Sequence, residues 1–155
     1  MHLLLNETSY RRKSSSIVLS DELSRICLIK RDPHPNILFP GYWGLPGGNQ
    51  EENESEIECA RRELREELSI EPRYMNLLSR ITEHTDIISP SIHTVTAYWA
   101  TFDSNMTIVQ SEGVCYEFFT RAQLASNLKV VPYDYLFVSL YFMTILDRKN
   151  CIESR

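Results

Sequence analysis

The sequence predicts a single α/β domain, and three observations lead to this prediction. The chain has 155 residues, 43% of them hydrophobic, which is enough for one buried core and too few for two. Segments with strand character stand on both sides of one long segment with helical periodicity, as in α/β domains. No repeat, low-complexity tract or linker divides the chain. We therefore expect one domain over residues 1–155.

Short hydrophobic segments bounded by turn residues predict the strands. The first two are joined by the turn-prone Ser20-Asp21-Glu22, and a proline-rich break over residues 32–36 follows the second. A later strand alternates through Val95, Ala97 and Trp99, which predicts one inward face. The expected strands are residues 15–19, 25–30, 75–82, 93–102 and 114–120.

The main helix is predicted from its start signals and its hydrophobic stripe. Ser55 with Glu58, or Asn53 with Glu56, fits a capping box, so the helix begins within one turn of these residues. Its core-facing stripe at helical spacing consists of Ile57, Ala60, Leu64 and Leu68. Residues 121–125 are expected to form a turn or short helix, and residues 133–146 an amphipathic helix rich in aromatic residues.

Three acids on the main helix need an explanation. Glu63, Glu66 and Glu67 lie three and four residues apart, so a helix makes them neighbours, and like charges there repel by roughly 0.2–0.5 kcal/mol per pair. Three or four residues away, Glu66 has only Arg62 as a basic partner, and Glu63 and Glu67 have none. Clustered carboxylates beside an anchored helix face suit a hard cation such as Mg²⁺. The alternative is a solvated helix face.

A glycine pair directly before this helix favours the metal site. Gly47 and Gly48 follow Trp43, and adjacent glycines let the backbone take positive φ and approach a ligand closely. Alone, the pair would be an ordinary turn. Before a carboxylate helix, it predicts one wall of a site for a metal and a diphosphate.

Together these residues resemble the signature of the Nudix hydrolases. Gly48, Glu54 and the run from Arg62 to Ile70 stand at the spacing of that signature, and the only departure is Ser69, where the family has glycine. The resemblance implies an α/β/α sandwich around a mixed β-sheet. It also implies hydrolysis of a nucleoside diphosphate linked to another group, X, with Mg²⁺ or Mn²⁺ as cofactor.

The resemblance also assigns roles to residues of this chain. The metal ligands would be Glu63, Glu66, Glu67 and Gly48. Glu63 would also be a candidate base, oriented by Arg62, and Glu54 would make a secondary or water-mediated contact. Glu112, before Gly113, resembles an acid that some members use as a further ligand or base, although a solvated turn explains it equally well; Glu117 is a poorer candidate.

Three further residues are candidates for substrate binding. Lys30 and Arg31 end an expected strand and would contact phosphates, unless they simply terminate the strand. Asp134 lies where the branch that cleanses oxidised nucleotides reads the nucleobase, but it could instead cap its helix. Phe39, Tyr42 and Trp43 would stack on a base or belong to the core.

Ser69 concerns backbone geometry more than chemistry. A glycine just past a helix end usually adopts a left-handed conformation, which costs serine on the order of 1 kcal/mol. We therefore expect a stability defect at Ser69 and no lost ligand.

Composition limits the partners and the location. The net charge of −5 argues against a nucleic-acid partner. It does not argue against nucleotides, whose phosphates a metal and nearby basic side chains would bind. Four widely spaced cysteines without a CxxC motif favour reduced thiols, and His34, His84 and His93 lack metal-ligand spacing. The apolar run over residues 3–5 is too short for a signal peptide, and no stretch has the length of a membrane span. We expect a cytoplasmic protein, and an oligomer stays open.

The substrate is less defined than the reaction. Our first candidate is a nucleoside triphosphate, including an oxidised one, that yields a nucleoside monophosphate. ADP-ribose or a nucleotide sugar comes next, and a diphosphate without a nucleoside stays open. The competing class is a nucleotide-sensing module that binds without hydrolysis.

Overall fold

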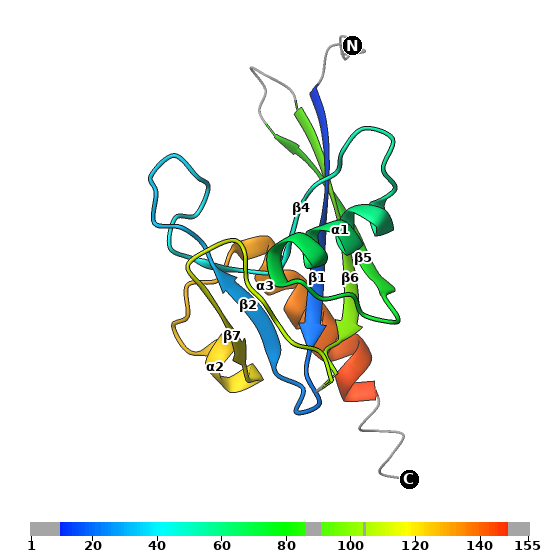
Figure 1. Cartoon of the computed structure of the whole chain (residues 1–155). Coiled ribbons are helices and arrows are strands. Elements are labelled where there is room, and N and C mark those ends of the chain that lie inside the picture. The colour runs from blue at the N-terminus through cyan, green and yellow to red at the C-terminus, as the bar shows by residue number, and fades with distance from the viewer. Residues whose placement is uncertain (1–9, 86–90, 104, 149–155) are drawn as a thin grey trace.

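The computed structural model describes residues 10–85, 91–103 and 105–148 (Figure 1). The segment considered for a signal peptide lies mostly outside these residues, as does Cys151. The remaining cysteines, Cys27, Cys59 and Cys115, are free thiols.

A mixed sheet forms the centre of the fold. Its strand order is β3-β2-β1-β6-β5, with β4 paired to β1 and β7 paired to β2. β1 and β6 run parallel, and the other paired strands are antiparallel. The strands are β1 (Tyr10–Ser20), β2 (Ile26–Lys30), β3 (Trp43–Gly44), β4 (Gly47–Asn49), β5 (Asn76–Thr85), β6 (Ser91–Thr101) and β7 (Cys115–Phe119).

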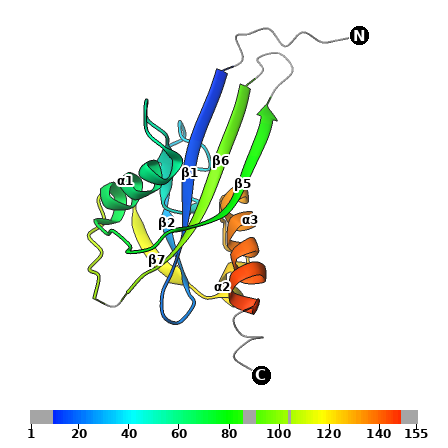
Figure 2. The same ribbon diagram turned by 90° about the vertical axis from the view of Figure 1, so that its right-hand side faces the viewer.

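Helices cover both faces of the sheet (Figure 2). α1 (Glu56–Leu68) packs on one face, and α3 (Pro132–Tyr141) packs on the other and continues into η1 (Phe142–Leu146), a turn of π-helix. The short α2 (Arg121–Ala125) follows β7. This arrangement confirms the predicted α/β/α sandwich. None of the helices in the described residues is long and apolar enough to cross a membrane.

The alternation of side chains along β1 creates two hydrophobic clusters. Ile17 and Leu19 point to α1, where they join Leu64, and Val18 points to the opposite face, where it joins Phe137. All five side chains are fully buried. The sheet is therefore fixed from both sides, and α1 has little freedom to shift against it.

Most predicted elements are confirmed, and the differences have physical causes. β1 begins five residues before the expected strand because residues 10–14, although polar, pair with β6. β3 and β4 were missed because strands of two and three residues leave no periodic pattern. Ile57 was wrongly placed in the core: it is 36% exposed, and Cys59 is buried instead.

The ends of α1 confirm the predicted start and the expected strain at its C-terminus. Ser55 is the N-cap in a complete capping box with Glu58, so the alternative box at Asn53 is wrong. Ser69 adopts the left-handed conformation, with φ 56° and ψ 32°, and its N–H donates to Arg65 O. A serine therefore occupies the position where glycine costs least.

The Ser69→Gly variant should be more stable. Relief of about 1 kcal/mol corresponds to a rise of about 2–4 °C in Tm for a chain of this length, measured by differential scanning calorimetry. Ser139→Gly, inside the right-handed α3, is the matched control and should lower Tm. A large gain in turnover without stabilisation would show that Ser69 acts on the reaction.

Candidate active site

Arg62 holds three acids around the middle of α1. Its Nη1 donates to Glu63 Oε1 at 2.8 Å and to Glu66 Oε2 at 2.9 Å. Its Nε and Nη2 donate to the two carboxylate oxygens of Glu54 at 2.8 and 3.0 Å, which lowers the pKa of Glu54. A further bond from Nη2 reaches Asn49 O at 2.9 Å, so the guanidinium also ties α1 to β4.

This hub corrects the expectation that Glu63 has no basic partner. Helical spacing makes neighbours of residues three and four positions apart, whereas Arg62 directly precedes Glu63 and still reaches its carboxylate. Glu54, expected to make a secondary contact, binds Arg62 directly. Arg62 is thus positioned by Glu54 on one side and contacts Glu63 on the other, as an orienting residue would be.

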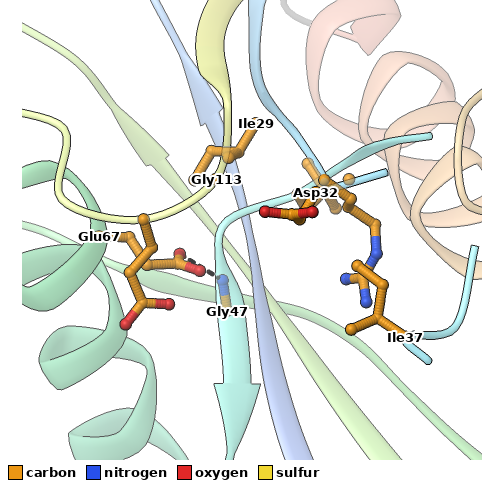
Figure 3. A pocket seen from close by; sticks show the side chains of 10 residues that line it. Ile29, Asp32, Ile37, Gly47, Glu67 and Gly113 are labelled. Carbon is orange, nitrogen blue, oxygen red and sulfur yellow. Dashed lines mark hydrogen bonds between the residues drawn. The ribbon is translucent and has the colours of Figure 1, made fainter. Parts of the chain in front are cut away.

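Glu67 turns away from this hub toward β4. The Gly47 N–H donates to Glu67 Oε2 at 2.9 Å, and Figure 3 shows the carboxylate reaching across to the strand. Burial raises the pKa of Glu67 to about 8, against the effect of the Gly47 bond, and the charges of Glu63 and Glu112 raise it further. Burial likewise raises the pKa of Glu63, opposed by Arg62.

Both glycines are required by close approach. Gly47 has φ +145°, and a Cβ there would lie 2.1 Å from Ser15 O on β1. At Gly48, a Cβ would lie 2.4 Å from Glu63 Oε1. β4 therefore fits between β1 and the acids of α1 only because it carries no side chains at these two positions.

The loop before β7 brings a further acid, Glu112, close to the helix. The Ser111 N–H donates to Glu67 O at 2.9 Å, and Glu112 then lines a hollow of about 200 Å³ together with Glu67 and Gly47. Glu117, by contrast, is exposed on β7 and does not line this hollow. Glu112 is therefore better placed than Glu117 to act at the site.

The donor set suits a hard divalent cation, although the ligands are not gathered in advance. In residues 10–85, 91–103 and 105–148, no three His, Cys, Asp or Glu side chains form a ready cluster for a metal. The reason is visible in the contacts, because Arg62 holds Glu63 and Glu66 while Gly47 holds Glu67. These carboxylates nevertheless lie near one another, and their negative charges are only partly offset by basic side chains. Carboxylate oxygens are the ligands that Mg²⁺ binds.

A second, larger cleft of about 280 Å³ adjoins the first. Arg31, Leu45 and Gly47 border both hollows, so the two adjoin at these three residues. Phe39 lines the cleft, whereas Trp43 packs edge-on against Phe119 at 4.8 Å in the core. Tyr42 packs against Phe39 with ring centres 5.5 Å apart and lines neither hollow, so Phe39 is the one of the three aromatic candidates that borders the cleft.

Of the two predicted phosphate-binding bases, only Arg31 borders the site. Its Nε donates to Leu38 O at 2.9 Å, which holds the side chain beside both hollows. Lys30 points elsewhere: its Nζ lies 5.7 Å from the centre of the Trp43 ring, and Lys30 lines neither hollow. The prediction for Lys30 therefore gains no support from its position.

Asp134 does not cap α3, contrary to the alternative considered for it. The N-cap is Val131, without a side-chain hydrogen bond, and Asp134 Oδ2 accepts the Leu45 N–H at 3.0 Å. Asp134 lines the larger cleft, and burial raises its pKa to about 7 against the Leu45 bond and the charge of Arg31. Near neutral pH this carboxyl group is thus present in both protonation states.

Solved structures of small α/β proteins share this fold. The NUDIX domain of Shewanella oneidensis NrtR, complexed with ADP ribose, matches with a TM-score of 0.69 and 22% identity, over 87% of this chain and 88% of that one. A MutT NUDIX hydrolase from Burkholderia pseudomallei matches with a TM-score of 0.68 and 24% identity, over 85% and 98%. The Escherichia coli dihydroneopterin triphosphate pyrophosphohydrolase matches with a TM-score of 0.67 and 17% identity, over 90% and 99%.

The α/β/α sandwich is thus the fold of solved NUDIX domains. The family model for the NUDIX domain matches residues 10–141, and the chain belongs to this family. It is a Nudix-type pyrophosphohydrolase that acts on acid anhydrides of nucleotide derivatives.

The Gly48→Ala variant should displace Glu63 while leaving the fold in place. The added Cβ would meet the flexible end of the Glu63 side chain, so Tm should change by less than about 3 °C, and Mn²⁺ affinity measured by calorimetry should fall at least about tenfold. Gly47→Ala, which would clash with backbone instead, should lower Tm much more. Unchanged Mn²⁺ binding in Gly48→Ala would contradict a role for Glu63 in the metal site.

Asp134 should make stability depend on pH. Its folded pKa of about 7 lies above the ordinary aspartate pKa of 3.8, so between these two pH values the folded state binds more protons than the unfolded state. The free energy of unfolding should therefore fall as pH rises through this window and level off above it. In Asp134→Asn this part of the dependence should vanish, as shown by the difference in Tm between wild type and variant at pH 4–8. A constant difference across that range would contradict the assignment.

Proposed function

We propose that the protein hydrolyses a nucleoside diphosphate linked to X, with Mg²⁺ or Mn²⁺ as cofactor and water as the nucleophile at phosphorus. The observation that carries this proposal is the approach of β4 to α1. The Gly47 N–H binds Glu67, and the space that a side chain at Gly48 would fill is occupied by Glu63. Two residues without side chains thus lie against the acids, and the hollow lined by Gly47, Glu67 and Glu112 offers room for a diphosphate beside them.

The chain itself supplies the ligands and the base. Glu63, Glu66, Glu67 and Glu112, with the carbonyl of Gly48, would hold the cation. When bound, the cation offsets phosphate charge, polarises a phosphoryl oxygen and lowers the pKa of a water molecule. Glu63 is the first candidate for the base that accepts the water proton, and Arg62 orients its carboxylate at 2.8 Å.

The larger cleft would bind the rest of the substrate. Arg31, which borders both hollows, would contact the phosphates between the two. Phe39 would stack on the base, and Asp134 would bind its edge with a carboxyl group that donates or accepts a proton near neutral pH. A nucleoside triphosphate, including an oxidised one, is the first candidate substrate.

A second candidate is an ADP-ribose-like or nucleotide-sugar substrate. The NUDIX domain of Shewanella oneidensis NrtR, which shares this fold, was solved with ADP ribose. The cleft of about 280 Å³ extends well beyond the carboxylate helix and offers room for an X group. The sensor class would bind such compounds without hydrolysing them.

Glu67→Gln should abolish turnover. The amide keeps the shape of the side chain and removes one charge from the metal site, so release of nucleoside monophosphate with Mg²⁺ should fall at least about 100-fold. Glu58→Gln is the matched control: it lies on the same helix, removes the same charge and still accepts a bond from Ser55. Turnover of both variants is measured on a panel of triphosphates, ADP-ribose and nucleotide sugars.

The outcomes separate the classes. Turnover that survives Glu67→Gln would refute the metal-site assignment. Binding of the panel without turnover would favour the sensor. Chelation of the cation with EDTA should stop hydrolysis in the wild type, and hydrolysis that persists would exclude the proposed cofactor.

A further inference from the structure

A line of four polar side chains runs along the outer wall of the larger cleft. The four come from four elements: Ser14 from β1, His93 from β6, Glu83 from β5 and Tyr133 from α3. All four line the cleft, on the face of the sheet that packs against α3. None belongs to the Nudix signature, and we expected no chemistry from His93.

These side chains contact one another in order. Ser14 Oγ lies 2.9 Å from His93 Nε2, and His93 Nδ1 lies 3.6 Å from Glu83 Oε1. The Tyr133 hydroxyl donates to Glu83 Oε2. The histidine and glutamate side chains are only 19% and 27% exposed, so solvent does not satisfy them fully.

The contacts determine where the protons lie. A carboxylate only accepts hydrogen bonds. One oxygen of Glu83 accepts the bond from the Tyr133 hydroxyl, so the His93 Nδ1 that faces the other oxygen carries a proton rather than a lone pair. Burial and the charge of Arg12 lower the pKa of His93, against the effect of Glu83, and so favour the neutral form of the ring. In a neutral ring with the proton on Nδ1, Nε2 is an acceptor, and the Ser14 hydroxyl donates to it.

This leaves Ser14 as an acceptor toward the cleft. Its only proton is committed to His93, so the unused lone pairs of Oγ are what a ligand meets. A carbonyl oxygen in that place would face another acceptor, whereas an amino or hydroxyl group would form a hydrogen bond. Glu83 does not contact Ser14, but it acts through His93 to make the Ser14 hydroxyl an acceptor toward the cleft.

The position of Ser14 indicates which part of a substrate it meets. On β1, Ser16 pairs with Gly47 and Ser14 pairs with Asn49. At about 3.3 Å per residue, Ser14 lies about 7 Å along the strand from the level of Gly47. Phosphates beside the glycine pair would thus place the attached nucleoside, rather than the phosphates themselves, next to Ser14.

We propose that Ser14 is a specificity-determining residue that accepts a hydrogen bond from an amino or hydroxyl group of the substrate's nucleoside, with His93, Glu83 and Tyr133 as positioning residues. The inference rests on the proposed function in one respect, that a nucleotide occupies this cleft. The other reading is purely structural, since the same contacts also tie α3 to the sheet.

Nucleoside 5′-monophosphates test the proposal without hydrolysis. GMP differs from IMP by one amino group and from dGMP by one hydroxyl group, whereas AMP carries an amino group where IMP has a carbonyl oxygen and a protonated N1. Calorimetry in Mg²⁺ gives their Kd values. In the wild type, the member with the amino or hydroxyl group should bind about tenfold more tightly in at least one pair. In Ser14→Ala, that ratio should fall to about twofold or less.

Two further variants separate recognition from structure. His93→Leu keeps the serine hydroxyl but frees its proton, so Ser14 can also donate to the carbonyl oxygen of IMP, and the ratio between AMP and IMP should fall although Ser14 is unchanged. Thr94→Val is the matched control: it is the next residue on β6, faces the opposite side of the sheet and bonds to Thr82 Oγ1 at 3.0 Å. It should keep the wild-type ratio.

Each outcome decides the matter. The proposal is overturned if the Kd ratio persists in Ser14→Ala, or if the wild type prefers the donor-bearing nucleotide in no pair. A fall in Tm with an unchanged Kd ratio assigns these residues a structural role only. Hydrolysis is assayed separately with the corresponding triphosphates. Loss of the ratio in Ser14→Ala together with absent hydrolysis would refute the proposed function and leave the role of Ser14 standing.

Discussion

The close approach of β4 to β1 is the constraint on which the site depends. With a Cβ at Gly47 only 2.1 Å from Ser15 O, no other residue fits there without moving backbone. The strand in turn presents its Gly47 N–H to Glu67, and the Asn49 carbonyl accepts a bond from Arg62. The close packing of β4 thus orients Glu67 directly, and it orients Arg62, which holds the other acids.

The electrostatics of α1 follow from this arrangement. Arg62 serves Glu54, Glu63 and Glu66 at once, so one guanidinium offsets part of the repulsion that the sequence displays. Glu67 accepts a hydrogen bond from the Gly47 N–H, and burial raises its pKa to about 8 although the charge of Arg31 lowers it. On the side of the helix that faces Gly47 and Glu112, the charge of Arg31 does not offset burial and the neighbouring acids, and these carboxylates would attract a divalent cation.

The sequence predicted the features that depend on residues close together in the chain. The capping box at Ser55, the left-handed Ser69 and the acids of α1 all follow from spacings of a few residues. The sequence could not predict that Glu54 binds Arg62 or that β4 exists, because neither has a periodic pattern. It predicted nothing for His93, whose partner Ser14 is 79 residues away and becomes a neighbour only when β1 pairs with β6.

That parallel pairing also bears on how the chain folds. β1 is the first strand and pairs with β6 along its whole length, so the centre of the sheet closes only after the long intervening segment, including α1, has been made. Contacts between distant segments require costly loop closure and form slowly. Until β6 arrives, one edge of β1 has no partner, and this stretch of exposed backbone is where a nascent chain of this protein would be most prone to pair with another chain.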